Sequence, residues 1–212
     1  LKVGTLFEPD YEAINAAEAD LVIVGGRSRA KLPDVSAITP AIDLSIDSKA
    51  FTQSVKANIT NLGYITGKKD EAAKLIANLD EKINALKAIA PEAGTAMILI
   101  TNAGKIGVYG PSSRTGWLHT EIGFKTVANA IDDRNHGGDA ASFEYIKEKN
   151  PDWLFVIDRD RVLATTILAM LQSRCWITNL FARPLLGKRV KLFISTHRLL
   201  TSSPLAIRHL QL

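Results

Sequence analysis

Hydrophobic and polar residues alternate with two different periods along the first 160 positions. Asp10–Glu18 carries apolar residues at helical spacing, and Leu21–Val24 is an uninterrupted apolar run that predicts a buried strand. Residues 35–45 alternate polar and apolar side chains and predict a second strand. Ser48–Asn61 predicts another helix, which we expect Gly63 to end.

A long helix is predicted over Lys68–Ala90, where apolar residues recur every third or fourth position over about 30 Å. Beyond this helix the strand pattern returns. Strands are expected at Ala96–Thr101, Ile106–Tyr109 and Trp153–Ile157, and short helices at Thr115–Gly123 and Phe143–Lys149. Alternating strands and helices on both sides of one long helix predict two α/β lobes.

One pattern occurs twice in the chain, from Glu8 to Arg27 and from Ser142 to Arg159. Each copy is a short helix, a turn with an aspartate, an apolar strand, and an arginine just past the carboxyl end of that strand. In open α/β sheets, ligands bind beyond the carboxyl ends of strands. The repeat therefore predicts one arginine at such an edge in each lobe, with a binding cleft between the lobes.

The composition changes near Arg161. Residues 1–160 carry 18 Lys and Arg against 22 Asp and Glu, whereas residues 161–212 carry 8 Lys and Arg, no acidic residue and twelve leucines. Such a stretch is atypical of a globular chain with 23% charged residues. A shifted reading frame, with free choice of synonymous codons, restores acids, glycines and tyrosines. We interpret residues 161–212 as a frameshifted tail; a basic nucleic-acid-binding tail is the alternative.

Four segments carry a family resemblance: Gly4–Asp10, Gly25–Arg27, Tyr109–Arg114 and Asn150–Arg159. With them, residues 1–160 resemble periplasmic iron–siderophore-binding proteins, the substrate receptors of ABC importers, and in particular their catecholate (enterobactin-like) branch. The resemblance implies an α/β fold of two Rossmann-like lobes connected by one long rigid helix. It also implies that the first strands of the N-lobe and a signal peptide are missing. The expected parts are a partial N-lobe (1–67), the inter-lobe helix (68–90), the C-lobe (91–160) and the anomalous tail (161–212).

The implied ligand is a ferric siderophore complex, and arginines suit a catecholate. A ferric tris-catecholate is a bulky anion with aromatic rims, and arginine combines a permanent charge with a planar donor fork that stacks on rings. Arg27, Arg114 and Arg159 are therefore the candidate ligand-binding residues. Solvated surface arginines are the alternative.

Three further residues are candidates near the ligand. The resemblance implies that His136, in a loop rich in aspartate and glycine, approaches or ligates the iron where the siderophore leaves coordination sites open, and only hydrogen-bonds an intact hexadentate siderophore. A solvent-facing histidine is the alternative. Tyr109 and Trp117 flank the Arg114 turn and are expected to line the pocket or to pack in the core. The resemblance also implies that Glu12 and Glu144, at equivalent places in the repeat, dock onto the importer permease.

Several other functions are disfavoured by the sequence. Only two histidines precede the tail, which argues against a receptor for a bare metal ion, and we expect no resident metal or cofactor. The sequence lacks the glycine motifs of nucleotide enzymes, which disfavours an enzyme. An α/β enzyme is therefore only the second hypothesis. Other bulky ligands (a hydroxamate siderophore, haem or cobalamin) stay open. We expect a monomer that binds no nucleic acid and is periplasmic, or lipid-anchored at the surface of a Gram-positive host.

Overall fold

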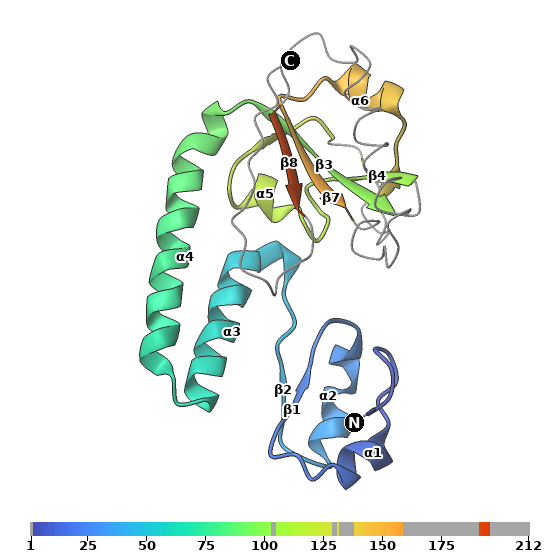
Figure 1. Ribbon diagram of the computed structural model, residues 1–212, viewed down its shortest axis with the longest axis vertical. Helices are drawn as coiled ribbons and strands as arrows, with labels where there is room; N and C mark the ends of the chain where they lie inside the picture. The colour runs from blue at the N-terminus through green and yellow to red at the C-terminus, as the bar shows by residue number, and fades with distance from the viewer. Residues whose placement is uncertain (1, 103–104, 129–130, 132–137, 159–190, 196–212) are drawn as a thin grey trace, which may run out of the picture. The chain divides into compact units, whose positions relative to one another are not determined.

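The computed structural model describes residues 2–102, 105–128, 131, 138–158 and 191–195. The chain divides into two units, Leu1–Leu79 and Asp80–Leu212. Each unit has its own β-sheet (Figure 1). The dividing point lies inside the long helix α4, so this helix contributes residues to both units.

Unit 1 begins with a helix and a short parallel sheet. Its first elements are α1 (Tyr11–Ala16), β1 (Val22–Val24), the 3₁₀ helix η1 (Gly26–Lys31), α2 (Leu32–Ser36) and β2 (Ala41–Asp43). The Asp10 carboxylate accepts a hydrogen bond from the Ala13 N–H at 2.9 Å and so caps α1. β1 and β2 pair in parallel, and Ile14, Val24 and Val35 form the buried core beside them.

The strand predicted over residues 35–45 is observed only at Ala41–Asp43. Residues 32–36 are helical, because Pro33 in the first turn favours helix initiation and Val35 is buried in the core on the helix. The alternation of polar and apolar residues there therefore spans two elements.

Two helices form an antiparallel hairpin after a short 3₁₀ turn, η2 (Ser48–Ala50): α3 (Phe51–Ile65) and α4 (Lys69–Ile89) (Figure 1). The prediction that Gly63 ends the helix is wrong, because Gly63 is buried inside α3. A Cβ atom at this position would collide with the Cβ of Ala72 in α4. The glycine thus permits close helix contact, and the chain turns at Gly67, where φ is +69°.

Unit 2 contains a mixed sheet of six strands. They are β3 (Thr95–Asn102), β4 (Lys105–Tyr109), β5 (Lys125–Thr126), β6 (Asp139–Ala140), β7 (Trp153–Asp158) and β8 (Lys191–Ser195). The order is β6-β4-β3-β7-β8, and β5 pairs with the start of β3. β7 and β8 run parallel to β3, whereas β4 is antiparallel to it. The strands β5, β6 and β8 were not predicted, and β8 belongs to the compositionally different tail.

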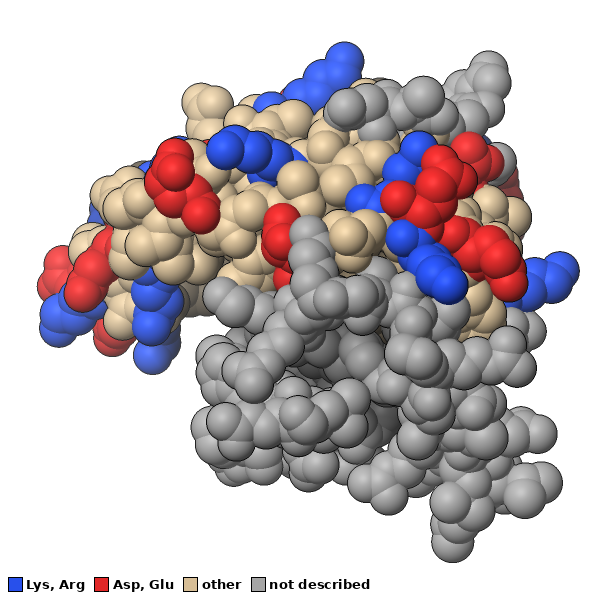
Figure 2. All heavy atoms as spheres, turned by 90° about the horizontal axis from the view of Figure 1, so that it is seen from above, with Lys and Arg blue, Asp and Glu red and all other residues tan. Residues whose placement is uncertain are grey.

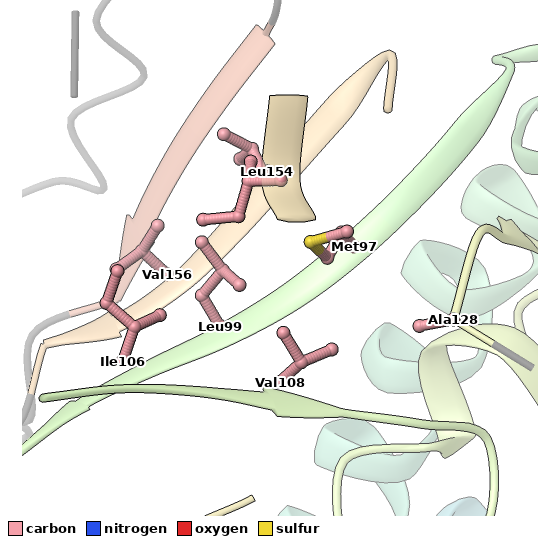
Figure 3. Close-up of a cluster of buried hydrophobic side chains, with 8 residues drawn as sticks. Met97, Leu99, Ile106, Val108, Ala128, Leu154 and Val156 are labelled. Atoms are coloured by element: carbon pink, nitrogen blue, oxygen red, sulfur yellow. The ribbon is translucent and has the colours of Figure 1, made fainter. Parts of the chain in front are cut away.

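The central strand β3 is buried on both faces. Met97 and Leu99 point into a cluster with residues of β4 and β7 (Figure 3), which α6 (Phe143–Lys149) covers through Ile146. Ala96, Ile98 and Ile100 belong to clusters on the other side, with residues of α5 (Trp117–Thr120). This two-sided burial follows from the period of two along a strand and explains the continuous apolar run.

The structure confirms a mixed α/β protein, and the long helix predicted over Lys68–Ala90 is observed as α4 with nearly the same bounds. A short 3₁₀ turn, η3 (Ala90–Glu92), follows it. Within the described ranges, no helix combines the length and apolar character needed to cross a membrane.

Candidate functional site

The Arg114 turn in unit 2 is built by its own hydrogen bonds. The Ser113 hydroxyl donates to the Gly110 carbonyl at 2.7 Å, and the Gly116 N–H donates to the Ser113 carbonyl at 2.9 Å. A Cβ atom at Gly116 would collide with the Pro111 carbonyl oxygen, so only glycine fits there. Ser113 is 4% exposed, whereas Arg114 next to it is exposed. The turn therefore presents the arginine from a fixed backbone.

Tyr109 connects Arg114 to the core. The guanidinium donates from Nη2 to the Tyr109 Oη at 2.6 Å, and its central carbon lies 5.3 Å from the centroid of the tyrosine ring. Tyr109 is 1% exposed and packs with Ile98 and Ile100. It lies opposite Ile98 in the antiparallel register, so β4 ends part of the way along β3 and not at its carboxyl edge.

The carboxyl edge of the unit 2 sheet has a buried polar pair. The Thr101 hydroxyl donates to Asp158 Oδ1 at 3.1 Å, and these residues are 4% and 2% exposed. Arg159, the predicted ligand-binding residue that follows Asp158, lies outside the described residues. His136 lies outside them as well, so the positions of both side chains stay predictions.

Arg27 in unit 1 follows the glycine turn at the end of β1. Gly26 has a φ of +56°, and its N–H donates to the Ser45 hydroxyl at 2.9 Å. The Arg27 guanidinium carbon lies 4.9 Å from the centroid of the Phe7 ring, and Phe7 is 56% exposed. Arg27 itself is exposed, which fits both a ligand-binding and a solvated surface arginine, so its role stays a prediction.

A surface hollow of about 620 Å³ adjoins Arg27. Its lining includes Arg27, Arg29, Pro33 and Asp43. Arg29 Nε and Asp43 Oδ2, both on residues that line the hollow, lie 3.0 Å apart. Burial raises the pKa of the Asp43 carboxyl. Hydrogen bonds from Ser45 and the charge of Arg29 together lower it by more than burial raises it, so the pKa lies below the ordinary value of 3.8.

The two predicted docking glutamates occupy the same place in their helices. Glu12 and Glu144 each lie in the first turn, two residues after a capping side chain, and both are exposed. The correspondence extends further along the repeat. Glu18 (φ 46°) and Asn150 (φ 43°) follow the two helices and are, within the described ranges, the two non-glycine residues with positive φ.

Trp117, the remaining described candidate for the pocket, lies in apolar surroundings. Trp117 is half-buried and packs against the cluster of Ala90, Ile122 and Phe124. His119 Nδ1 lies 2.8 Å from the Phe124 carbonyl oxygen. In the part of the chain that the structure describes, no group of three or more His, Cys, Asp or Glu side chains could hold a metal ion.

The predictions missed Phe7 and the Arg29–Asp43 pair. Phe7 lies in the Gly4–Asp10 segment, twenty positions before Arg27, so the sequence alone does not bring the two side chains together. The sequence has no local signal for the Arg29–Asp43 contact, because it depends on the parallel pairing of β1 and β2.

Charge is mixed on one face of the molecule. Figure 2 shows acidic and basic side chains interspersed on the face of the molecule that it draws. Arg27 and Arg114 each lie over an aromatic ring.

Comparison with known proteins gives consistent matches. A family model described as periplasmic binding protein matches residues 1–178, a range that extends into the acid-free tail. The petrobactin-binding protein YclQ of Bacillus subtilis is 34% identical over 165 residues, which are 77% of this chain and 52% of YclQ. The ferric enterobactin-binding periplasmic protein FepB of Escherichia coli O6:H1 is 33% identical over 124 residues, 55% of this chain and 38% of FepB. The match thus spans about half the length of YclQ and less than half the length of FepB.

Solved structures support the same fold. The crystal structure of YclQ matches with a TM-score of 0.70 and 30% identity, covering 91% of this chain and 67% of that one. The catecholate-siderophore-binding protein VctP of Vibrio cholerae matches with a TM-score of 0.74 and 25% identity, covering 91% and 68%.

Proposed function

Because this chain belongs to the periplasmic binding protein family, whose members are binding proteins rather than enzymes, we propose that it captures a ferric siderophore and delivers it to an ABC importer. The relatives support this ligand class, since YclQ is named for petrobactin and FepB for ferric enterobactin. A catecholate is the expected chemistry, with VctP as further support.

The observation that carries the proposal is the Arg114–Tyr109 pair. A ferric catecholate complex needs cationic groups that also tolerate aromatic surfaces, and a guanidinium held beside a ring offers both. Arg27 repeats the arrangement in unit 1 with Phe7. We assign Arg27, Arg114 and Arg159 to the charge of the ligand, and His136 to a hydrogen bond with it. Trp117 completes the proposed aromatic surroundings.

The delivery step involves the surface of both units. Glu12 and Glu144 stand at matching positions in exposed first turns of α1 and α6, and each is proposed to meet a basic side chain of the permease. We propose that α4 is the single rigid connection between two lobes, that the protein acts as a monomer, and that it works in the periplasm or on the outer cell surface.

Fluorescence titration with ferric enterobactin tests the proposal. The reporters in the described part of unit 2 are Trp117 and Trp153, and a version whose tail is restored to the shifted frame is titrated in parallel. Saturable quenching without chemical change of the ligand is expected. Binding by the restored version alone would assign the defect to the tail. A folded restored protein that binds no catecholate would contradict the proposal and direct the search to hydroxamates, haem or cobalamin.

A further inference from the structure

We propose that Tyr109 is a positioning residue that holds the Arg114 guanidinium ready for an anionic ligand before the ligand arrives. The inference rests on the proposed function and deepens it, because it states why one arginine of the site binds strongly. It assigns Tyr109 a role different from that of a pocket wall.

The first step is the immobility of the Tyr109 ring. The side chain is 1% exposed and belongs to a cluster with Ile98 and Ile100 of β3, with Phe155 and Ile157 of β7 packed against it. Side chains in such close-packed surroundings keep one rotamer, because a turn of the ring would displace its neighbours. The hydroxyl at the end of the ring is therefore a fixed point, although the arginine that it contacts is exposed.

The second step is the contact itself. Tyr109 Oη accepts a hydrogen bond from Arg114 Nη2 at 2.6 Å, and the same ring lies 5.3 Å from the guanidinium carbon. A hydrogen bond and a cation–π contact from one immobile side chain restrict the long arginine chain. Arginine otherwise has large rotamer entropy, which a ligand would have to overcome on binding.

The side chain that holds the Arg114 guanidinium carries no opposing charge. A phenol is neutral at physiological pH, so it holds the guanidinium without cancelling its positive charge. In unit 1, Arg29 contacts the carboxylate of Asp43 at 3.0 Å, and this ion pair is electrically balanced. Tyr109 is thus an anchor that brings no negative charge of its own to Arg114.

The sequence around the pair supports the same role. Arg114 lies five residues after Tyr109, and the turn between them is closed by the Ser113 hydroxyl and held tight at Gly116. Backbone and side chain are therefore fixed independently of each other. Their combination determines where the guanidinium lies.

The test is Tyr109→Phe in the full chain, which keeps the ring and removes the hydrogen-bond acceptor. For ferric enterobactin we expect a Kd about tenfold higher, the size of the cost of ordering one long side chain on binding. The dissociation rate should account for it, because long-range attraction and hence the association rate depend on the retained charge. The matched control is Tyr145→Phe, where Lys149 lies 5.4 Å above the ring, and we expect no change in Kd.

A double-mutant cycle separates positioning from mere stability. In an Arg114→Ala background, Tyr109→Phe should have no further effect on Kd, since the group that it positions is gone. Relaxation of the Arg114 Nε–H by ¹⁵N NMR gives a readout without ligand. This group should be ordered in the parent chain, mobile in Tyr109→Phe and ordered in Tyr145→Phe.

The experiments distinguish a wrong ligand assignment for Arg114 from a wrong positioning role for Tyr109. If neither the parent chain nor the tail-restored version binds ferric enterobactin or ferric petrobactin, or if Arg114→Ala binds as well as its parent, the assignment of Arg114 to the ligand is overturned and the inference with it. If Arg114→Ala binds weakly while Tyr109→Phe leaves both the dissociation rate and the Arg114 relaxation unchanged, only the positioning role is overturned. A Tyr109→Phe variant that loses active fraction at an unchanged dissociation rate also overturns it, because that is loss of fold.

Discussion

Arg27 and Arg114 both lie over an aromatic ring, but the two rings are held very differently. Phe7 beneath Arg27 is 56% exposed and belongs to the segment before α1. Tyr109 beneath Arg114 is 1% exposed, ends a strand of the larger sheet, and adds a hydrogen bond that phenylalanine cannot make. The same pairing of arginine and aromatic residue therefore involves a solvent-exposed ring in unit 1 and a buried ring in unit 2.

The sheets that precede the two arginines in the chain also differ. β1 has three residues and pairs only with β2 in the described part of the chain, and Ile23 is 53% exposed. β3 has eight residues and is buried on both faces. A two-stranded sheet has little stability of its own, so side chains anchored to it are held less firmly than those anchored to β3 and its neighbours.

The largest expected effect is on ligand affinity when each arginine is removed. Arg114→Ala should weaken binding of ferric enterobactin about 100-fold, and Arg27→Ala about tenfold, since a preordered group contributes more of its interaction to affinity. Lys147→Ala removes an exposed charge from α6 and serves as the control. Titration by fluorescence measures all three, and equal losses at the two arginines would contradict the comparison.

The next largest expected effect is on the free energy of unfolding when the glycine in either arginine turn is replaced. Gly116→Ala forces a Cβ against the Pro111 carbonyl and should lower the free energy of unfolding by about 2 kcal/mol. Gly26→Ala meets no atom within 4 Å and has only the strain of its φ of +56°, about 1 kcal/mol. Denaturant unfolding of each variant gives the two values, and a larger cost at Gly26 would show that the turns have been ranked wrongly.

A smaller effect is expected when the exposed ring is removed. Phe7→Leu keeps the apolar bulk and removes the π face beneath Arg27, which should weaken ligand binding about threefold, the size of an exposed cation–π contact. The same titration measures it. A tenfold loss would mean that Phe7 touches the ligand directly.

The smallest effect concerns acid stability in unit 1. The pKa of Asp43 is lower in the folded state, so its contribution to stability is present above the ordinary pKa of 3.8 and is lost as the pH falls through the lowered value. Asp43→Asn should be less stable than the parent at neutral pH and should approach it in acid. Amide hydrogen exchange in β1 and β2 between pH 7 and pH 3 measures the difference, and a pH-independent difference would contradict it.

Regular elements with strong periodicity were predictable from the sequence. α4 and β3 were expected with almost the observed bounds, because a repeated apolar spacing specifies which face is buried. Gly63 was misinterpreted because a glycine near a helix end is locally the same signal as a terminator. Only the approach of Ala72 from α4 shows that it permits a helix contact.

The site was predictable where its partners are close in sequence. Arg114 was identified from the turn motif, and Tyr109 stood in the same motif, although its hydrogen bond to Arg114 requires a geometry that the sequence does not give. Arg29 and Asp43 meet only because two strands pair in parallel. Such contacts are set by tertiary structure and have no periodic signal.

The two left-handed residues, Glu18 and Asn150, have a consequence for tracing the ancestry of the fold. A non-glycine residue with positive φ is uncommon, yet one follows the repeated helix in each unit although the residues differ. The two units therefore share a backbone conformation at a position where their side chains differ. A comparison of the two halves by their φ and ψ values would thus align them at positions where substitution scores find nothing to align.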